Sequence, residues 1–144
     1  MKLSENANYK NYLRYREADE YGLAIESLRA CLDDLRGHEY EALYRADLLQ
    51  RIGDLFLRRG ERDKAFAAHN EALRADPASL IIKLHFAAFL ARAGEHATAI
   101  SECDRIVKDV TDHPFAETED DLGSEYYLRE AKKLKDACLT DLKR

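Results

Sequence analysis

The chain has 144 residues, of which 46% are apolar and 35% are charged, a balance typical of a single domain that buries a core. The formal net charge of −5 argues against a general nucleic-acid-binding protein, because such proteins need a basic face. Two prolines and six glycines leave little room for linkers or for a β architecture with many turns, so we expect an all-α chain.

The N-terminal sequence "MKLSENANYK" lacks the apolar core of a signal peptide. No run of about 18 apolar residues occurs, so membrane insertion is not expected. The cysteines Cys31, Cys103 and Cys138 are far apart and odd in number, which predicts reduced thiols in a cytoplasmic protein. We interpret them as small core residues rather than as metal ligands or redox groups.

Residues 5–45 are predicted to form a first pair of helices. Aromatic and apolar residues mark the first helix: Tyr9, Tyr12, Leu13 and Tyr15. The second helix lies in "EYGLAIESLRACLDDL", with small or apolar residues at Ala24, Leu28 and Cys31. The segment "RGHEYEAL" (36–43) makes this pair longer than the next ones. We therefore expect the helices that flank it to be extended and Gly37 to break the first of them.

Residues 46–79 are predicted to form a second pair. The pattern indicates a helix, a turn and a second helix at 46–59, 60–62 and 63–75. Gly60 is expected to end the first helix with a positive φ. Pro77 is expected to stop the second one, because a residue before proline disfavours the helical conformation.

Residues 80–113 are predicted to form a third pair, with Ser79 as the N-cap of its first helix. The small and apolar residues that mark it are Phe86, Ala87 and Leu90 on the first helix and Ala99, Cys103 and Ile106 on the second. Lys83 replaces a large residue that the second pair has at the same place.

The tail is predicted to be a loop at about 111–122 and a helix at about 123–143 with Ser124 as its N-cap. Pro114 and Gly123 bound the acidic, disordered-looking middle of the loop. An apolar stripe at helical spacing marks the tail helix: Tyr127, Leu128, Ala131, Leu134, Cys138 and Leu142. We interpret this helix as a cover for the last apolar face of a repeat protein.

Two stretches of the chain are similar at a fixed spacing. "RRGERDKAFAAHNEAL" begins at Arg58 and "RAGEHATAISECDRI" begins at Arg92, 34 residues later. The glycine, glutamate and alanine of the first stretch, Gly60, Glu61 and Ala65, recur at Gly94, Glu95 and Ala99. A constant period of this size is typical of helical repeat arrays, whose units bury a core only when stacked.

The second pair resembles the tetratricopeptide repeat (TPR). The matching residues are Leu49, Ile52, Gly53, Phe56, Ala65, Ala72 and Pro77. Gly53 and Ala65 lack bulk where the two helices should approach closely, whereas His69 departs from the aromatic residue that the family prefers. The resemblance implies a right-handed superhelical array of antiparallel helix pairs, a TPR-like α-solenoid, with about three units and a C-terminal capping helix.

The resemblance also implies a concave groove, lined by the first helix of each pair, that binds a peptide or a helix of a partner protein. The residues transferred to this groove are Tyr9, Leu13, Asp47, Gln50, Arg51, Asp54, Ile81, Leu84, His85 and Ala88, with Asn6 beside them. Some family members clamp a C-terminal carboxylate with Lys, Asn and Arg. This chain does not reproduce that clamp, which argues against binding of chaperone C-termini.

Other interpretations of the same residues stay open. The C-terminal helix could cover Ile81 and Leu84, and Tyr9 and Tyr12 could belong to the core. Arg58 and Arg92 lie near the turn end of the groove, or they are solvated or capping charges at helix C-termini.

Motifs for catalysis or for a cofactor are missing from the sequence: there is no glycine-rich phosphate loop and no metal-binding spacing. No cofactor and no metal are expected. The leading hypothesis is a non-enzymatic adaptor or scaffold that binds another protein. The alternative is a chaperone similar to the small acidic TPR chaperones of bacterial secretion systems, and an enzyme with an unrecognised pocket comes last. Exposed end faces leave a homo-oligomer open.

Overall fold

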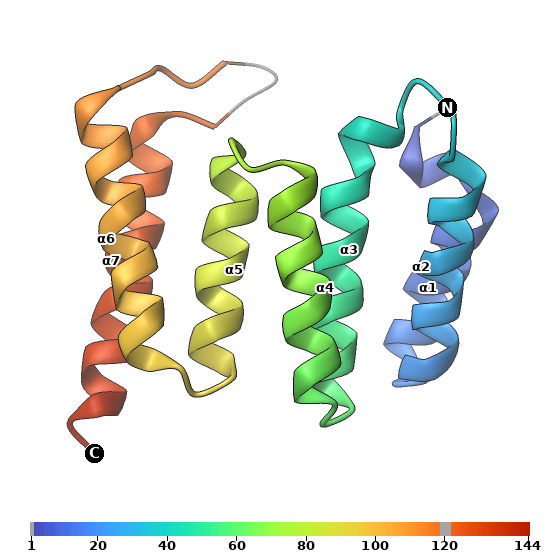
Figure 1. Cartoon of the computed structure of the whole chain (residues 1–144), viewed down its shortest axis with the longest axis horizontal. Helices are drawn as coiled ribbons and strands as arrows, with labels where there is room; N and C mark the ends of the chain where they lie inside the picture. The colour runs from blue at the N-terminus through green and yellow to red at the C-terminus, as the bar shows by residue number, and fades with distance from the viewer. Residues whose placement is uncertain (1, 119–121) are drawn as a thin grey trace. The chain divides into compact units, whose positions relative to one another are not determined.

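The computed structural model describes residues 2–118 and 122–144, and within these residues it is entirely helical, without a strand. The predicted all-α class is confirmed for this part of the chain. The helices are η1 (Leu3–Glu5), α1 (Ala7–Glu17), α2 (Tyr21–Leu35), α3 (Glu41–Arg58), α4 (Arg62–Ala75), α5 (Leu80–Arg92), α6 (His96–Asp112) and α7 (Ser124–Leu142) (Figure 1). They form two compact units, Met1–Pro77 and Ala78–Arg144.

Three of the connections between helices share one turn geometry. The second residue after the end of α1, α3 and α5 has a positive φ: Asp19 (57°), Gly60 (78°) and Gly94 (83°). In each turn the next residue is a glutamate whose N–H bonds the carbonyl five residues back, at 2.8–2.9 Å. This is the Schellman arrangement that satisfies the last carbonyls of a helix. The predicted positive φ of Gly60 is confirmed, and the first pair uses the same turn with aspartate in the place of glycine.

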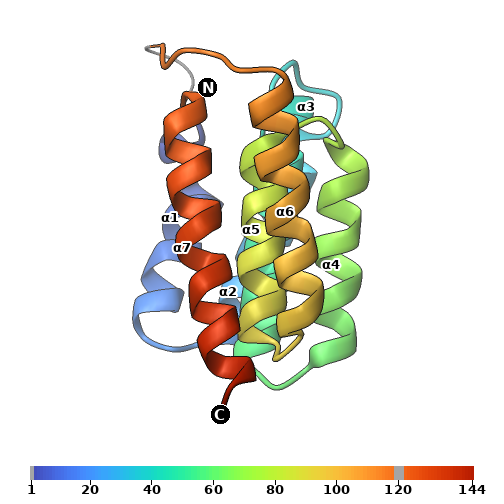
Figure 2. The same ribbon diagram turned by 90° about the vertical axis from the view of Figure 1, so that its left-hand side faces the viewer.

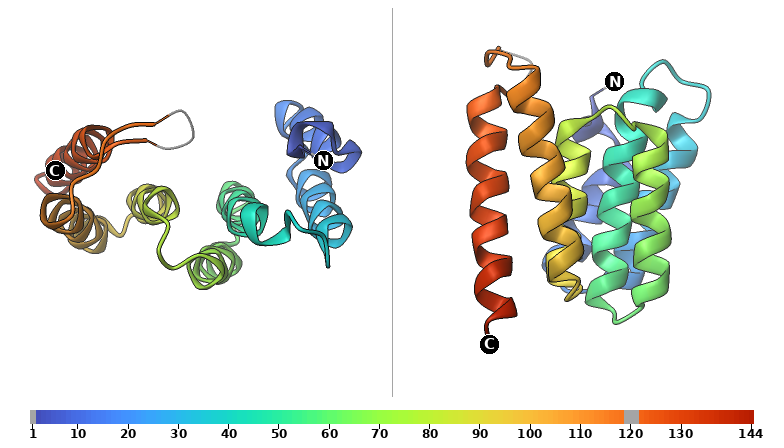
Figure 3. Two further views of the ribbon diagram at one scale, coloured as in Figure 1. Left: turned by 90° about the horizontal axis from the view of Figure 1, so that it is seen from above. Right: turned by 60° about the vertical axis from the view of Figure 1, so that its left-hand side comes forward.

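Small residues hold the helix pairs of the first unit together. Ala24 of α2 and Ala65 of α4 are fully buried, and each follows its turn by the same number of residues. A Cβ on Gly53 of α3 would meet the ring of His69 on α4. His69 is 1% exposed, so this departure from the repeat pattern is accommodated by the absence of a side chain at Gly53. Figure 3 shows the helices end-on, each beside its pair partner.

The connection between α2 and α3 differs in part from its prediction. The helix predicted at 46–59 begins earlier, because α3 starts at Glu41. The Glu41 carboxylate accepts a hydrogen bond of 2.8 Å from the backbone N–H of Gly37, which fixes the turn just before the helix. The expected extension is thus carried by α3. Gly37 lies in the turn after the end of α2, with φ of 76°.

The second unit consists of α5, α6 and α7, which lie side by side in Figure 2. Its core joins all three helices through Leu84, Ala87, Cys103, Ile106, Val110, Tyr127 and Ala131. The tail helix therefore covers apolar residues of both α5 and α6. All three cysteines of the chain are buried, as predicted.

Helix ends in the second unit follow the prediction at α5 but not at α7. The Ser79 hydroxyl accepts a hydrogen bond of 3.3 Å from the N–H of Ile82, so the predicted N-cap is confirmed. The prediction that Ser124 caps α7 is wrong, because Gly123 is the N-cap. The Ser124 hydroxyl instead accepts from the N–H of Phe115 at 2.6 Å and donates to its carbonyl at 2.9 Å, which closes the loop after α6. The middle of the predicted acidic loop, 119–121, lies outside the described residues.

Candidate functional site

The predicted groove residues fall on two surfaces, one in each compact unit. In the first unit they lie on α1 and α3, and in the second unit they lie on α5. Asn6, which the repeat register placed beside them, is a structural residue. It is buried, its Oδ1 caps α1 by accepting from the N–H of Tyr9 at 3.0 Å, and its amide donates to Asp34. Its side chain is therefore unavailable to a partner.

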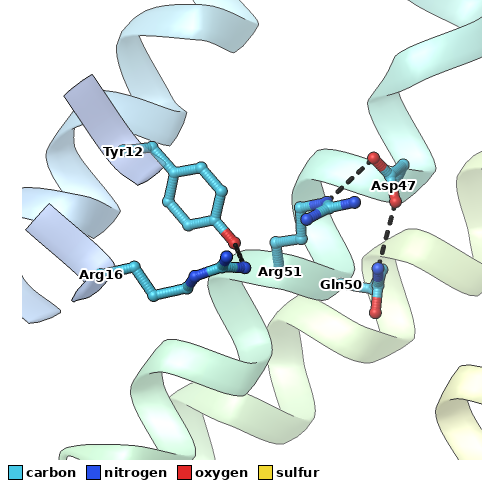
Figure 4. A network of polar contacts seen from close by, with 5 residues as sticks. All are labelled: Tyr12, Arg16, Asp47, Gln50 and Arg51. Atoms are coloured by element: carbon cyan, nitrogen blue, oxygen red, sulfur yellow. Dashed lines mark hydrogen bonds and ion pairs between the residues drawn. The ribbon is translucent and has the colours of Figure 1, made fainter. Parts of the chain in front are cut away.

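Four residues of the first surface are in contact with one another, and Figure 4 shows the three that lie on α3. The Asp47 carboxylate accepts from Nε of Arg51 at 3.0 Å and from Nε2 of Gln50 at 3.1 Å. Between the first and second helix pairs, the Arg51 guanidinium of α3 lies 5.8 Å from the centre of the Tyr9 ring of α1, a cation–π contact. The structure thus brings together Tyr9 of α1 with Asp47, Gln50 and Arg51 of α3.

Leu13 and Asp54 complete the predicted set in the first unit. Leu13 is half-buried on α1. Asp54 lies on α3, but its carboxylate is 3.2 Å from Nε2 of His69. A carboxylate only accepts, so the ring N–H of His69 donates in this contact. Asp54 therefore supports the α3–α4 pair, which lowers its availability for a partner.

Two residues that the prediction did not place in the groove complete this surface. The Arg16 guanidinium donates to the Tyr12 hydroxyl at 3.2 Å and lies 5.4 Å from the centre of the same ring. Tyr12 is 2% exposed, which agrees with the interpretation of this residue as core. In the sequence, the spacing of four residues between Tyr12 and Arg16 could have indicated this contact, because it places both residues on one helix face.

The electrostatics of this surface keep Arg51 charged and Tyr9 neutral. Burial by itself would lower the pKa of Arg51, but the Asp47 carboxylate together with the Tyr12 and Tyr9 phenols outweighs it and holds that pKa above its ordinary value. Burial raises the pKa of the Tyr9 phenol, although Arg51 opposes the shift. The surface therefore presents two guanidiniums and the Tyr9 phenol against one carboxylate that is already paired, an arrangement suited to polar contacts with a peptide.

The second surface is a hollow of about 380 Å³ between α5 and α7. Three predicted residues, Leu84, His85 and Ala88, line it from α5. Tyr126, Leu134 and Ala137 face them from α7, with Glu130 and Lys133 beside them. The tail helix is thus a wall of the hollow rather than its occupant.

Ile81 and Leu84 are bound into the core of the second unit. Leu84 is 7% exposed and belongs to the core cluster, and Ile81 is packed against that cluster. Most of the surface of these two residues is therefore covered, which agrees with the alternative that α7 packs over them. Ala88 and His85 remain half-buried, so Ala88 is a sharper position than Leu84 at which to test binding.

The two turn arginines, Arg58 and Arg92, are exposed. Arg58 lies with its guanidinium 5.9 Å from the centre of the Tyr21 ring on α2. This contact ties the turn end of α3 to the start of α2.

The described residues offer neither a metal site nor a membrane-spanning helix. They contain no group of three or more His, Cys, Asp or Glu side chains that could hold a metal ion. None of their helices is long and apolar enough to cross a membrane. In comparisons with known proteins, neither a family model nor a curated protein matches this chain.

Proposed function

We propose that the chain is a non-enzymatic protein–protein interaction module, built as a TPR-like array of helix pairs, that binds a peptide or helical segment of a partner. The observation that carries the proposal is the α5–α7 hollow. It is lined mostly by apolar side chains and has a volume of about 380 Å³, and three residues assigned to the groove from the repeat register line it. Grooves of this kind accept the apolar face of a helix or an extended segment.

The repeated turns and buried alanines support the proposed array of helix pairs. Equivalent turns after α1, α3 and α5 have the same hydrogen bonds, and the alanine after each turn, Ala24, Ala65 and Ala99, is fully buried. A unit repeated in this way cannot bury its apolar face alone and gains its core from its neighbour. Within the first unit, the first helices α1 and α3 then present their outer faces to a partner.

The polar surface on α1 and α3 supplies the second part of the proposed binding mode. Arg51 and Arg16 are held by contacts within the chain, at Asp47, Tyr9 and Tyr12. Side chains whose rotamers are fixed before binding lose less entropy when a partner arrives. They would therefore contact polar groups of a bound peptide at a small cost in entropy.

The test is a selection of random displayed peptides on the full chain, followed by binding measurements with the enriched peptides. Ala88→Glu places a carboxylate in the hollow, and Ala97→Glu is the matched control at an exposed site on α6. We expect Ala88→Glu to weaken binding by about tenfold or more, a loss of about 1.4 kcal/mol, and Ala97→Glu to leave it unchanged.

Equal binding to Ala88→Glu and to the wild-type chain would exclude the hollow as the site. Affinity purification from cells then separates the two protein-binding functions. An adaptor should bind its peptide segment reversibly, whereas a stoichiometric complex with a client that is insoluble alone would favour the chaperone.

A further inference from the structure

The first unit has a hollow of its own, which is not part of the predicted groove. It lies between α2 and α4, has a volume of about 570 Å³, and has Leu49, Ile52 and Phe56 of α3 as its apolar floor. At 3.6 residues per turn, these three residues lie on the side of α3 opposite to Asp47, Gln50, Arg51 and Asp54. We call this hollow the α2–α4 cleft.

Positive charge gathers at the cleft although the chain as a whole is acidic. Four basic residues line it, Arg29, Arg36, Arg45 and Lys64, against the two acidic residues Asp33 and Glu71. The whole sequence, by contrast, has 23 Lys and Arg against 28 Asp and Glu. The cleft is therefore a local basic patch in a protein that otherwise repels acidic partners.

Two of the four cations are not neutralised by a carboxylate in the part of the chain that the structure describes. Arg36 pairs with Asp33 at 2.9 Å, and Lys64 pairs with Glu61 at 3.2 Å. Neither Arg29 nor Arg45 forms an ion pair within the described residues. Both side chains are exposed, so an incoming carboxylate could pair with them without breaking an ion pair.

Two of the cations also meet at one aromatic ring. The Arg29 guanidinium lies 5.6 Å and the Lys64 ammonium 5.8 Å from the centre of the Phe56 ring. Each contact is favourable by itself, but like charges near one ring repel each other. A carboxylate placed beside the ring would be attracted by both cations, and an apolar side chain next to it would pack against Phe56.

We propose that the α2–α4 cleft is a second binding site and that its ligand is an acidic amphipathic segment of a partner protein. The carboxylates of the segment pair with Arg29 and Arg45, and an apolar side chain enters between the helices. A nucleic acid fits less well, because its dense charge would face Asp33 and Glu71 on the same rim while the apolar floor stayed unused.

The experiment uses the Ala88→Glu chain, whose α5–α7 hollow is blocked, as bait for random displayed peptides. The tightest enriched peptide is labelled with fluorescein, and its binding is measured by anisotropy. We expect enriched peptides to combine Asp or Glu with at least one large apolar residue. Because the bait retains the cleft and the readout uses variants of the cleft itself, failure of the groove proposal leaves this result unaffected.

Two double variants test whether the enriched peptide binds at the cleft. Arg29→Glu/Arg45→Glu reverses both charges at the cleft, and Lys132→Glu/Lys143→Glu makes the same change of net charge at exposed positions of the second unit. Like-charge contacts at an interface are strongly unfavourable. We expect the cleft variant to bind about tenfold more weakly or worse and the control variant to bind as the parent does.

Three results would overturn the proposal. The first is a selection without acidic peptides, and the second is equal binding by the two double variants while circular dichroism shows both folded. The third is a labelled oligothymidylate that binds more tightly than the acidic peptide, because the cleft would then be a general polyanion site.

Discussion

Gly53→Ala tests the closest contact between α3 and α4. The added Cβ would lie 2.6 Å from Nε2 of His69 and closer still to Cδ2, well inside contact distance. The neighbouring atoms belong to a ring that is 1% exposed, so the ring cannot swing into solvent without leaving the core. Either the ring shifts and loses its contact with Asp54, or the two helices separate.

The magnitude follows from three effects of different sign. Alanine is better than glycine in a helix by about 1 kcal/mol. Overpacking a core position costs about 1–3 kcal/mol, and a buried polar group that loses its hydrogen bond costs about 1–3 kcal/mol more. The costs exceed the gain, so Gly53→Ala is expected to destabilise the first unit by about 1–5 kcal/mol.

A second substitution, His69→Ala, should reverse the sign of the stability change caused by Gly53→Ala. In a His69→Ala chain the ring is absent, so the added methyl group of Gly53→Ala meets no clash and only the helix preference remains. Gly53→Ala should then stabilise the protein by about 1 kcal/mol. The coupling between the two sites, measured by a double-mutant cycle, should reach about 2 kcal/mol or more.

The assay is chemical denaturation of the four proteins followed by far-UV circular dichroism. Gly22→Ala is the matched control, since a Cβ there would lie 3.6 Å from the Arg59 guanidinium, an ordinary contact. It should be neutral or stabilising. The reasoning fails if Gly53→Ala behaves like Gly22→Ala, or if its penalty persists in the His69→Ala chain.

Two further predictions concern the first turn and the buried thiols. Asp19→Gly should raise the melting temperature, with a gain of up to about 1 kcal/mol, because Asp19 is an L-residue at φ 57°. Gly60→Ala at the equivalent turn should lower stability by about 1–2 kcal/mol. A loss of stability in Asp19→Gly or a gain in Gly60→Ala would show that the turns are not equivalent. Burial raises the pKa of Cys31 from 9.0 to about 12, and burial together with the nearby Cys138 raises that of Cys103 to about 11. The native state therefore holds these thiol protons after the unfolded chain has lost them, so the contribution is complete below pH 9 and is lost as pH rises toward 11 and 12. Urea titrations at increasing pH should show this fall, and Cys31→Ala should reduce it; alkylation of the native thiols that is faster than global unfolding would contradict the burial argument.

The sequence predicted the helix pairs where local signals were strong. Gly60 and Gly94 mark turns because glycine adopts a positive φ at little cost, and the structure confirms both. The turn at Asp19 has the same geometry but no glycine, so the first pair was harder to recognise. The early start of α3 depends on a side-chain contact from Glu41 to Gly37, which no periodicity reveals.

Less of the candidate site could be predicted. Contacts within one helix, such as Asp47 with Arg51, follow from a spacing of four residues. The contact of Arg51 with Tyr9 depends on how α1 packs near α3, which repeat register indicates only coarsely. Asn6 and Asp54 were assigned to the groove by register, yet both side chains are engaged by structural partners.

The state of the charges separates the two proposed surfaces of the first unit. On the groove side of α3, Arg51 is already paired with Asp47, so a partner's carboxylate would compete with an existing ion pair and gain little. At the α2–α4 cleft, Arg29 and Arg45 have no ion-pair partner among the described residues. Both side chains are exposed to solvent, so salt screens their attraction for a partner's carboxylate. Binding at the cleft should therefore weaken steeply as salt is added. Binding in the α5–α7 hollow, which depends mainly on apolar contact, should change little.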